Sequence, residues 1–186
     1  MSDTYTLKVA GIKRELPICP VDESLSIAAF VMFGDIKLTI ACAKELLARV
    51  PEYDVIITAE SKGIPLAYEM SRQSGKQYIL ARKSKKLYMR KAVAVKVKSI
   101  TTSGIQNLYL DESDLEQLQG RQVLVVDDVI STGESLAALE QIVETAGGQV
   151  AGKAAVLAEG EAARRTDIIY LEYLPLFRTR DKHLVD

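Results

Sequence analysis

The sequence predicts an α/β fold with a central, mostly parallel sheet flanked by helices. Short runs of β-branched and other apolar residues alternate with helical patterns along most of the chain. This alternation is typical of parallel sheets, because each helix carries the chain back to the start of the next strand. The runs are apolar throughout, as expected for strands that are buried on both faces. The sheet should therefore form the middle of the molecule.

Length and composition limit the number of domains and the kinds of partner. A chain of 186 residues, 48% of them hydrophobic, can build one core of ordinary size. No repeat or low-complexity linker divides it, so we expect a single domain over residues 1–186. The formal net charge of -1 gives no reason to expect binding to nucleic acid or a membrane. The longest apolar run, residues 27–33, is far shorter than the ~18 residues that a membrane span needs.

Cysteine and histidine usage argues against several kinds of site. Cys19 and Cys42 follow no metal-binding spacing, and no basic-headed apolar segment at the N-terminus suggests export. We therefore expect two buried, reduced thiols in a cytoplasmic protein. His183 is the only histidine and lies four residues from the end, which argues against a Ser-His-Asp triad or a His-rich zinc site.

The N-terminal segment is expected to lie outside the main sheet. The stretch YTLKVAGIKRELPI suggests two short strands around Gly11, and Pro17 and Pro20 mark a chain that leaves the sheet. We assign residues 1–34 to a small N-terminal hood. Asp35 can cap the helix that follows, which Pro51 ends. The apolar residues of this helix recur at three- and four-residue steps: Ile36, Ile40, Ala43, Leu47 and Val50.

The main sheet is predicted from apolar runs that follow this helix. One helix, residues 64–73, separates the first two strands, and a second, residues 133–146, follows the third and is stopped by Gly147 and Gly148. The predicted strands cover residues 53–59, 78–82, 122–128, 150–158 and 167–173.

Two adjacent carboxylates, Asp127 and Asp128, end the most apolar strand. In an open parallel sheet, ligands bind outside the carboxyl ends of the strands. The pair offers acceptors for the vicinal hydroxyls of a sugar or for a divalent cation. One aspartate could instead cap the next helix while the other is solvated. Signalling receiver domains also open with a strand and an acidic pair, but only 59 residues follow Asp127, too few for the rest of that fold.

Small polar residues follow the pair at the start of the next helix. The backbone N–H groups there have no partners within the helix, and the helix dipole favours an anion. The stretch contains neither the GxxxxGK[ST] nor the GxGxxG nucleotide motif. Sugar acceptors followed by a monophosphate site fit a phosphorylated ribose. The predicted phosphate-binding residues are Ser131, Thr132, Gly133, Glu134 and Ser135.

A strongly basic stretch covers residues 82–98, with eight Lys or Arg residues and no acidic one. A solvated run of charge is the ordinary interpretation of such a stretch. It begins, however, at the end of the 78–82 strand, on the same sheet edge as Asp127, where it could clamp a polyanion such as pyrophosphate. Its length and polarity suggest a mobile lid.

A further turn, ESKGIP at residues 60–65, lies between the 53–59 strand and the next helix. Its backbone amides around Ser61, Lys62 and Gly63 could hold the same anion. An ordinary structural turn is equally consistent with these six residues alone.

Taken together, these stretches resemble the type I phosphoribosyltransferases. VLVVDDVISTGES, residues 123–135, resembles their phosphoribosyl pyrophosphate (PRPP) signature, and ESKGIP resembles their pyrophosphate loop. ARK at 81–83 is similar to their basic strand end, and residues 84–107 to their flexible lid. The resemblance runs from about residue 21 to residue 177. Within the family, the purine enzymes for adenine and xanthine look most similar.

The resemblance implies a role for each candidate residue. Asp127 and Asp128 would be the catalytic pair that holds the ribose hydroxyls, with Mg²⁺ at Asp128, and residues 131–135 would hold the 5-phosphate. Lid residues Lys86 and Tyr88 would close over the pyrophosphate. That group would be bound by Ser61, Lys62, Gly63, Arg82 and Lys83.

The acceptor base is the harder question. Enzymes for 6-oxopurines commonly present a lysine near the end of the strand that here reads KAAVLAEG, where this chain has Ala158 and Glu159. An acceptor at Glu159 suits the amino group of adenine, although Glu159 could equally cap the next helix. Phe30 and Phe177 could stack on a purine, but core packing is the competing interpretation. We expect adenine, with xanthine or another 6-oxopurine as the alternative, and a homodimer by resemblance.

Three positions depart from the family pattern. Glu134 stands where many members have glycine, which brings a carboxylate near the expected phosphate. Ser131 stands where hypoxanthine-guanine enzymes have an aspartate that acts on the base. No acidic residue lies between Lys83 and Asp111, where adenine enzymes often have a glutamate. A regulator that binds PRPP without catalysis is the alternative of another class, but the chain shows no DNA-binding pattern.

Overall fold

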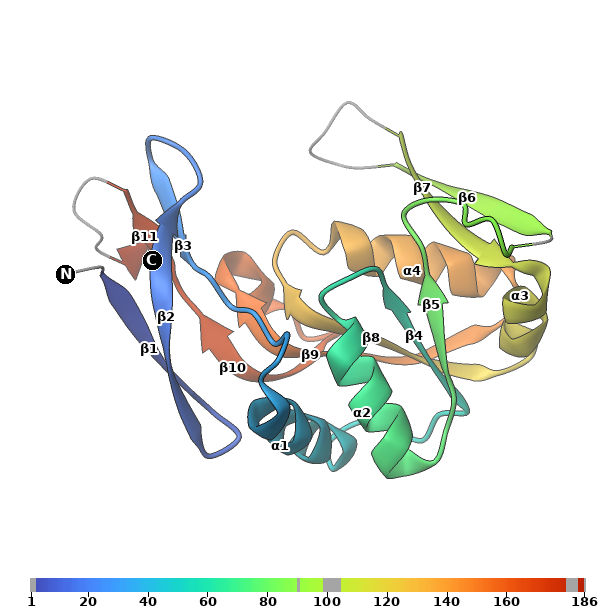
Figure 1. Ribbon diagram of the computed structural model, residues 1–186, viewed down its shortest axis with the longest axis horizontal. Helices are drawn as coiled ribbons and strands as arrows, with labels where there is room; N and C mark the ends of the chain where they lie inside the picture. Colours follow the sequence, from blue (N-terminus) through green and yellow to red (C-terminus); the bar gives the residue numbers. More distant parts are fainter. Residues whose placement is uncertain (1–2, 90, 99–104, 180–183, 186) are drawn as a thin grey trace.

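A five-stranded parallel sheet forms the centre of the computed structural model, which describes residues 3–89, 91–98, 105–179 and 184–185 (Figure 1). The strand order is β10-β9-β8-β4-β5, and every neighbouring pair is parallel. The prediction of an α/β fold with all five of these strands is therefore confirmed. The strands are β4 (Val55–Ala59), β5 (Tyr78–Ala81), β8 (Gln122–Ile130), β9 (Gln149–Glu159) and β10 (Ile169–Leu174).

Helices cover both faces of this sheet. In Figure 1, α1 (Ile36–Leu47) and α2 (Ile64–Ser74) lie below it and α4 (Glu134–Thr145) lies above it. Alternate residues of β8 serve the two sides: Leu124 and Val126 pack in the core that contains α1 and α2, whereas Val123 and Val125 pack in the core that contains α4. This double burial explains why the strand is continuously apolar. None of the described helices is long and apolar enough to cross a membrane.

A second, five-stranded sheet stands beside the first, with the order β1-β2-β3-β11-β12. The predicted strand pair around Gly11 is present as an antiparallel hairpin, and its turn residues Ala10 and Gly11 have φ of 48° and 71°. The hood predicted from residues 1–34 omitted the C-terminal strands of this sheet. The strands are β1 (Thr4–Val9), β2 (Ile12–Pro20), β3 (Leu25–Ala28), β11 (Leu176–Arg178) and β12 (Leu184–Val185).

Helix α1 begins where it was predicted, and Ala43 and Leu47 of the predicted stripe pack in or against the core, but the two isoleucines of that stripe do not. The Leu38 N–H donates to Asp35 Oδ1 at 3.2 Å, so Asp35 is the N-cap. Ile36 and Ile40, which were expected to face the core, are 73% and 41% exposed. The helix is apolar on more than one side, so the three- and four-residue spacing fits two different stripes. The buried stripe consists of Leu38, Thr39, Cys42, Ala43 and Leu46.

The two thiols are free, but only one is fully buried. Burial raises the pKa of Cys42 to about 12, so this thiol is unreactive at neutral pH. Cys19 is half-buried at the edge of the hood, so the expectation of two buried thiols was wrong for this residue.

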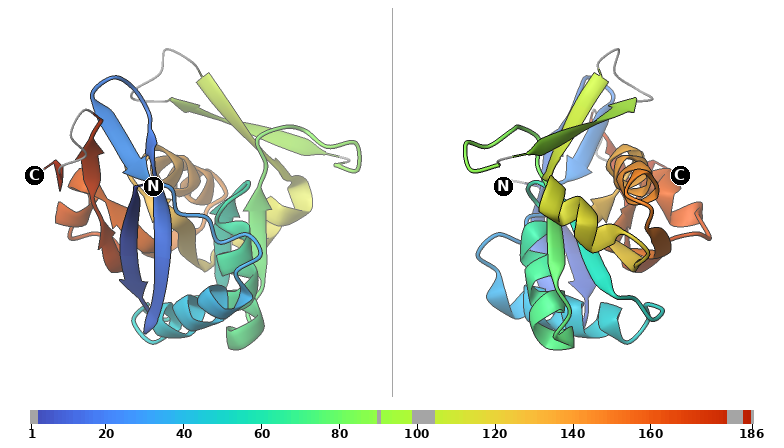
Figure 2. Two further views of the ribbon diagram at one scale, coloured as in Figure 1. Left: turned by 60° about the vertical axis from the view of Figure 1, so that its left-hand side comes forward. Right: turned by 90° about the vertical axis from the view of Figure 1, so that its right-hand side faces the viewer.

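Much of the expected lid is an antiparallel hairpin, β6 (Ala92–Lys98) and β7 (Ile105–Asp111). Of the predicted lid, residues 84–107, positions 90 and 99–104 lie outside the described residues. The hairpin projects on the side opposite the second sheet (Figures 1 and 2). Arg82 and Tyr109 exchange backbone hydrogen bonds of 2.9 and 2.8 Å, which joins β7 to the end of β5. Helix α3 (Glu112–Leu118), which was not predicted, follows with a capping box.

Candidate active site

A cavity of about 420 Å³ lies at the carboxyl edge of the main sheet, where the second sheet approaches it. Strands β4 and β8 are neighbours at the point where the strand order reverses. The chain continues from β4 to β5 in one direction and from β8 to β9 in the other. Ligands of open α/β sheets bind at such a switch in strand order. The cavity is therefore at the position where this architecture binds ligands.

The lining of the cavity includes most of the predicted site and some residues that were not predicted. The residues that were not predicted are Ile27, Ala28, Ala29, Val31, Ala59, Glu60, Val129 and Leu174. Most of these have no chemical signature in the sequence, although Glu60 and Val129 stand inside motifs that had been singled out. The predicted residues that line the cavity are Phe30, Ser61, Lys62, Lys83, Asp127, Asp128, Ser131, Ser135 and Glu159.

Half-buried Asp127 and buried Asp128 form a pair of like charge. Asp128 is only 4% exposed, and its Oδ2 has no hydrogen-bond partner in the described part of the chain. The Asp128 N–H donates to Asp127 Oδ1 at 2.9 Å. Burial and then the Asp128 charge raise the pKa of Asp127 to about 7, and burial raises the pKa of Asp128 against the opposing effects of its Asp127 and Val129 contacts and of Lys62. Such a pair favours hydroxyl donors or a hard cation.

The turn after β4 lies directly against this pair. Gly63 is the N-cap of α2, and a Cβ at this position would overlap Thr58 Oγ1 and would lie 3.1 Å from Asp127 Oδ1. Only glycine permits this approach. The Glu60–Ser61 peptide bond in the same turn is cis. The turn predicted to hold pyrophosphate and the predicted sugar acceptors are thus brought together.

A second, smaller cavity of about 40 Å³ lies at the start of α4. Its lining contains Thr132, Gly133 and Glu134, together with Ser131 and Ser135, which also line the large cavity. Gly133 is the N-cap of α4 and has φ of 79°, in the left-handed region that glycine favours. The backbone N–H groups and the dipole of a helix start suit a small anion next to the carboxylate pair.

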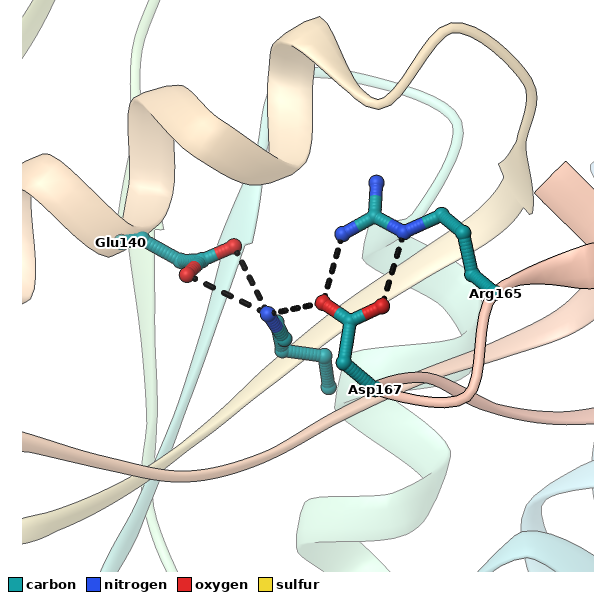
Figure 3. Close-up of polar contacts among 4 residues, drawn as sticks. Glu140, Arg165 and Asp167 are labelled. Atoms are coloured by element: carbon teal, nitrogen blue, oxygen red, sulfur yellow. Dashed lines mark hydrogen bonds and ion pairs between the residues drawn. The ribbon is translucent and has the colours of Figure 1, made fainter.

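A network of ion pairs holds this end of α4 (Figure 3). Lys153 of β9 bridges Glu140 of α4 at 3.2 Å and Asp167 at 2.6 Å. Arg165 binds Asp167 through Nε and Nη2 at 2.9 and 2.7 Å, and these contacts hold the pKa of Asp167 well below its usual range. A Cβ at Gly133 would collide with Arg165 Nη1, so this guanidinium lies against the turn that starts α4.

The predicted basic residues gather around Glu60. Arg82 Nη1 donates to Glu60 Oε1 at 3.1 Å, the Lys83 N–H donates to Oε2 at 3.0 Å, and Lys86 Nζ lies 3.6 Å from Oε1. The Arg82 guanidinium also lies over the ring of Tyr88, 5.6 Å from its centroid. Lys83 lines the large cavity, whereas Arg82, Lys86 and Tyr88 lie outside its lining.

The three candidate base-binding residues lie in different surroundings. Glu159 lines the cavity at the end of β9, and burial raises its pKa against the opposing effect of Lys62. Phe30 is 4% exposed and also lines the cavity. Phe177 is 5% exposed, packs edge-on against Tyr5 at 5.7 Å between centroids, and lies outside the cavity lining. We therefore retain Glu159 and Phe30, and assign Phe177 to the core.

The carboxylate pair fits a metal that binds together with a substrate. In the described ranges, no group of three or more His, Cys, Asp or Glu side chains is arranged to hold a metal ion; His183 lies outside those ranges. Mg²⁺ is usually held by one or two carboxylates plus substrate phosphates. The orphaned Asp128 Oδ2 is an oxygen donor of the required kind.

The fold and the site define a class of α/β protein that binds a phosphorylated, hydroxyl-bearing ligand at the switch point of a parallel sheet. Residues 32–177 match the model of the phosphoribosyl transferase domain family. The chain belongs to this family, and the resemblance seen in the sequence motifs is confirmed.

Individual relatives agree with this assignment. The chain is 38% identical over 117 residues to an adenine phosphoribosyltransferase of Cenarchaeum symbiosum, a match that covers 62% of this chain but only 66% of the relative. It is 31% identical over 156 residues to a xanthine phosphoribosyltransferase of Exiguobacterium, covering 82% of this chain and 80% of the relative. The adenine phosphoribosyltransferase structure from Thermoanaerobacter pseudethanolicus superimposes with a TM-score of 0.64 at 21% identity, covering 76% of this chain and 84% of that one. At this identity the superposition supports the fold alone.

Proposed function

We propose that the protein is an adenine phosphoribosyltransferase of purine salvage. It transfers the 5-phosphoribosyl group from PRPP to adenine and releases AMP and pyrophosphate. The observation that carries the proposal is the meeting of three elements at one cavity edge: the carboxylate pair Asp127 and Asp128, the anion-binding start of α4, and the turn that contains Ser61. These elements match the hydroxyls, the 5-phosphate and the pyrophosphate of one molecule.

The residues divide the chemistry among them. Asp127 and Asp128 accept hydrogen bonds from the ribose hydroxyls, and the N–H groups at residues 131–135 hold the 5-phosphate. Lys62 and Lys83 stabilise the departing pyrophosphate, and Mg²⁺ bound with Asp128 would supply further positive charge to it. The transferred centre is oxocarbenium-like, so closure of the 84–107 segment would protect it from water.

Adenine is proposed as the acceptor because the base end of the cavity offers an acceptor group. Glu159, when ionised, can accept a hydrogen bond from the exocyclic amino group of adenine, and Phe30 offers an aromatic face beside it. The Cenarchaeum symbiosum relative is named as an adenine phosphoribosyltransferase, which supports the same base. Xanthine is the second candidate, since the Exiguobacterium relative is similar over a larger share of the chain.

We further propose a cytoplasmic homodimer that binds neither nucleic acid nor membranes. An apolar surface hollow of about 320 Å³ between α1 and α2 supports the dimer. Ile36, Ile40 and Tyr68 line this hollow and are 73%, 41% and 56% exposed. Apolar side chains gathered in this way are typical of a protein interface.

The test of the proposed site is the double substitution Asp127→Asn and Asp128→Asn. Removing one electrostatic contact to a transition state typically costs about 100-fold in turnover or more. We expect pyrophosphate release from PRPP and adenine to fall at least that far, while the circular dichroism spectrum is unchanged. A control that removes two exposed charges, Glu116→Gln with Glu144→Gln, should retain full turnover. Full turnover in the aspartate variant would refute the assignment.

A further inference from the structure

Glu60 lies among the cations that the proposed function assigns to pyrophosphate. Its two carboxylate oxygens contact Arg82 and the Lys83 N–H, with Lys86 close by. We propose that Glu60 is an internal substitute for pyrophosphate, which holds these donors in the ligand-free protein and releases them when pyrophosphate or PRPP binds. The inference rests on the proposed function, and it concerns how the same site changes between its free and bound states.

The contacts of Glu60 are those that a phosphate oxygen would make. Oε1 accepts from Arg82 Nη1 at 3.1 Å, and Oε2 accepts from the Lys83 backbone at 3.0 Å. The Lys83 N–H and the positive charges of Lys86 and Arg82 lower the pKa of Glu60 in spite of its burial, so the side chain is charged at neutral pH. A negative group therefore already occupies the cationic side of the site.

The positions of Glu60 and its cationic partners favour an exchange of Glu60 for the ligand over a permanent ion pair. Glu60 and Lys83 both line the large cavity, so a ligand there meets the carboxylate and one of its partners directly, and Arg82 and Lys86 lie just behind them on the same carboxylate. The side chains of Glu60, Arg82 and Lys86 are 21%, 29% and 32% exposed, and Lys86 is not in hydrogen-bond contact with the carboxylate. Pyrophosphate has more charge and more acceptor oxygens than one carboxylate, so it should displace Glu60.

The exchange would also reach the hairpin. Residues 82–86 begin the connection from β5 to β6, and the Arg82 backbone pairs with Tyr109 of β7. A change of partner at Arg82 and Lys86 therefore acts on the base of the segment that was predicted to close. The internal carboxylate would keep these residues ordered until the ligand arrives.

The substitution Glu60→Gln tests the inference, because glutamine keeps an oxygen for the Lys83 N–H but removes the competing charge. We expect calorimetric titration with pyrophosphate and Mg²⁺ to give a Kd about tenfold lower than in the unchanged protein, which corresponds to ~1.4 kcal/mol. Ribose 5-phosphate has no pyrophosphate group to compete with Glu60. Its Kd should therefore stay within about twofold, which corresponds to about 0.4 kcal/mol. Glu161→Gln is the matched control, because Glu161 pairs with Arg164 at the same 3.1 Å on the exposed surface.

The outcomes separate this inference from the proposed function. If the unchanged protein binds neither pyrophosphate nor ribose 5-phosphate, the proposed function is wrong. If it binds both and Glu60→Gln binds pyrophosphate equally or more weakly, Glu60 is a fixed support for Arg82 and the exchange is refuted. Retained ribose 5-phosphate binding shows that the variant is folded. Should Glu60→Gln not fold, Glu60→Asp, with its shorter side chain, must tighten pyrophosphate binding to a smaller extent.

Discussion

Asp127 and Asp128 are the residues at which function and stability conflict most directly. Two neighbouring carboxylates lie there, Asp127 half-buried and Asp128 buried, and one oxygen of Asp128 has no partner among the described residues. A buried charge without a partner destabilises a folded protein. The pair is nevertheless suited to a ligand that brings hydroxyl groups and a cation. Binding should relieve a strain that the free protein contains.

The first residue-scale prediction concerns pH. Burial raises the pKa of Asp127 to about 7, against ~3.9 in an unfolded chain. Between these values the folded protein binds more protons than the unfolded chain, so the free energy of unfolding falls as pH rises through this window. Asp127→Asn removes the effect. Its Tm should exceed that of the unchanged protein at pH 7.5, by about 2 to 4 °C for each kcal/mol relieved, and the difference should shrink towards pH 4.

Thermal unfolding at both pH values checks this expectation. The control Glu116→Gln removes a carboxylate that is exposed to solvent and not half-buried like Asp127. It should leave Tm almost unchanged at both pH values. A lower Tm for Asp127→Asn at pH 7.5 would show that the aspartate stabilises the free protein, contrary to the argument.

At this scale the sequence predicted residues with distinctive chemistry and missed those without it. The carboxylates, Ser61 and Lys83 were found because each stands in a polar motif at the end of an apolar strand. Ile27, Ala28, Ala29, Val31 and Leu174 line the same cavity but resemble ordinary core residues. Phe177 shows the converse: an aromatic residue in an apolar run indicates packing as readily as binding, and here it packs on Tyr5.

Helix α4 is the element on which the phosphate end of the site depends. Its first turn lines the small cavity, and its Glu140 is tied through Lys153 to Asp167 and Arg165 (Figure 3). The Lys153 side chain is 14% exposed and serves two carboxylates. This network fixes the helix against β9 and against the segment that leads to β10.

The element-scale prediction is that Lys153→Met lowers the free energy of unfolding by about 1 to 2 kcal/mol. Breaking a fully buried ion pair costs about 3 to 5 kcal/mol, but Glu140 and Asp167 are 28% and 48% exposed, so solvent screens part of the loss. Chemical denaturation measures the change. Arg164→Met, which breaks an exposed pair with Glu161, should cost less than about 1 kcal/mol. Equal costs for the two variants would show that the network has no special role.

The elements that were predicted less well are those for which distant pairing, high charge or an ambiguous spacing obscures the local pattern. Strand β3 pairs with β11, and Ser26 lies opposite Phe177, a contact that no local pattern encodes. The β6–β7 hairpin contains an alternating AVAVKVK stretch, but its high charge favoured the interpretation as a loop. In α1 the apolar residues fit two stripes, and only the tertiary packing selects between them.

On the scale of the whole molecule, the cavity belongs to several parts of the fold at once. The main sheet contributes the two aspartates, β3 of the second sheet and the residues after it contribute residues 27–31, and the turns after β4 and β5 contribute Lys62 and Lys83. Figure 2 shows the second sheet and the hairpin on opposite sides of the central sheet. This arrangement would enclose a sugar between a phosphate end and a base end. The base preference therefore depends on the whole assembly rather than on one motif.

The central claim is that this assembly transfers a phosphoribosyl group to adenine. Its most direct measurement is the rate of pyrophosphate release from PRPP and Mg²⁺ with a panel of adenine, xanthine, hypoxanthine, guanine and uracil. We expect kcat/KM for adenine to exceed that of every other base by at least about 100-fold, because the hydrogen bond at Glu159 rejects bases that lack an amino group at position 6 of a purine ring, guanine included. Release with none of the bases, or a preference for xanthine, would contradict the claim.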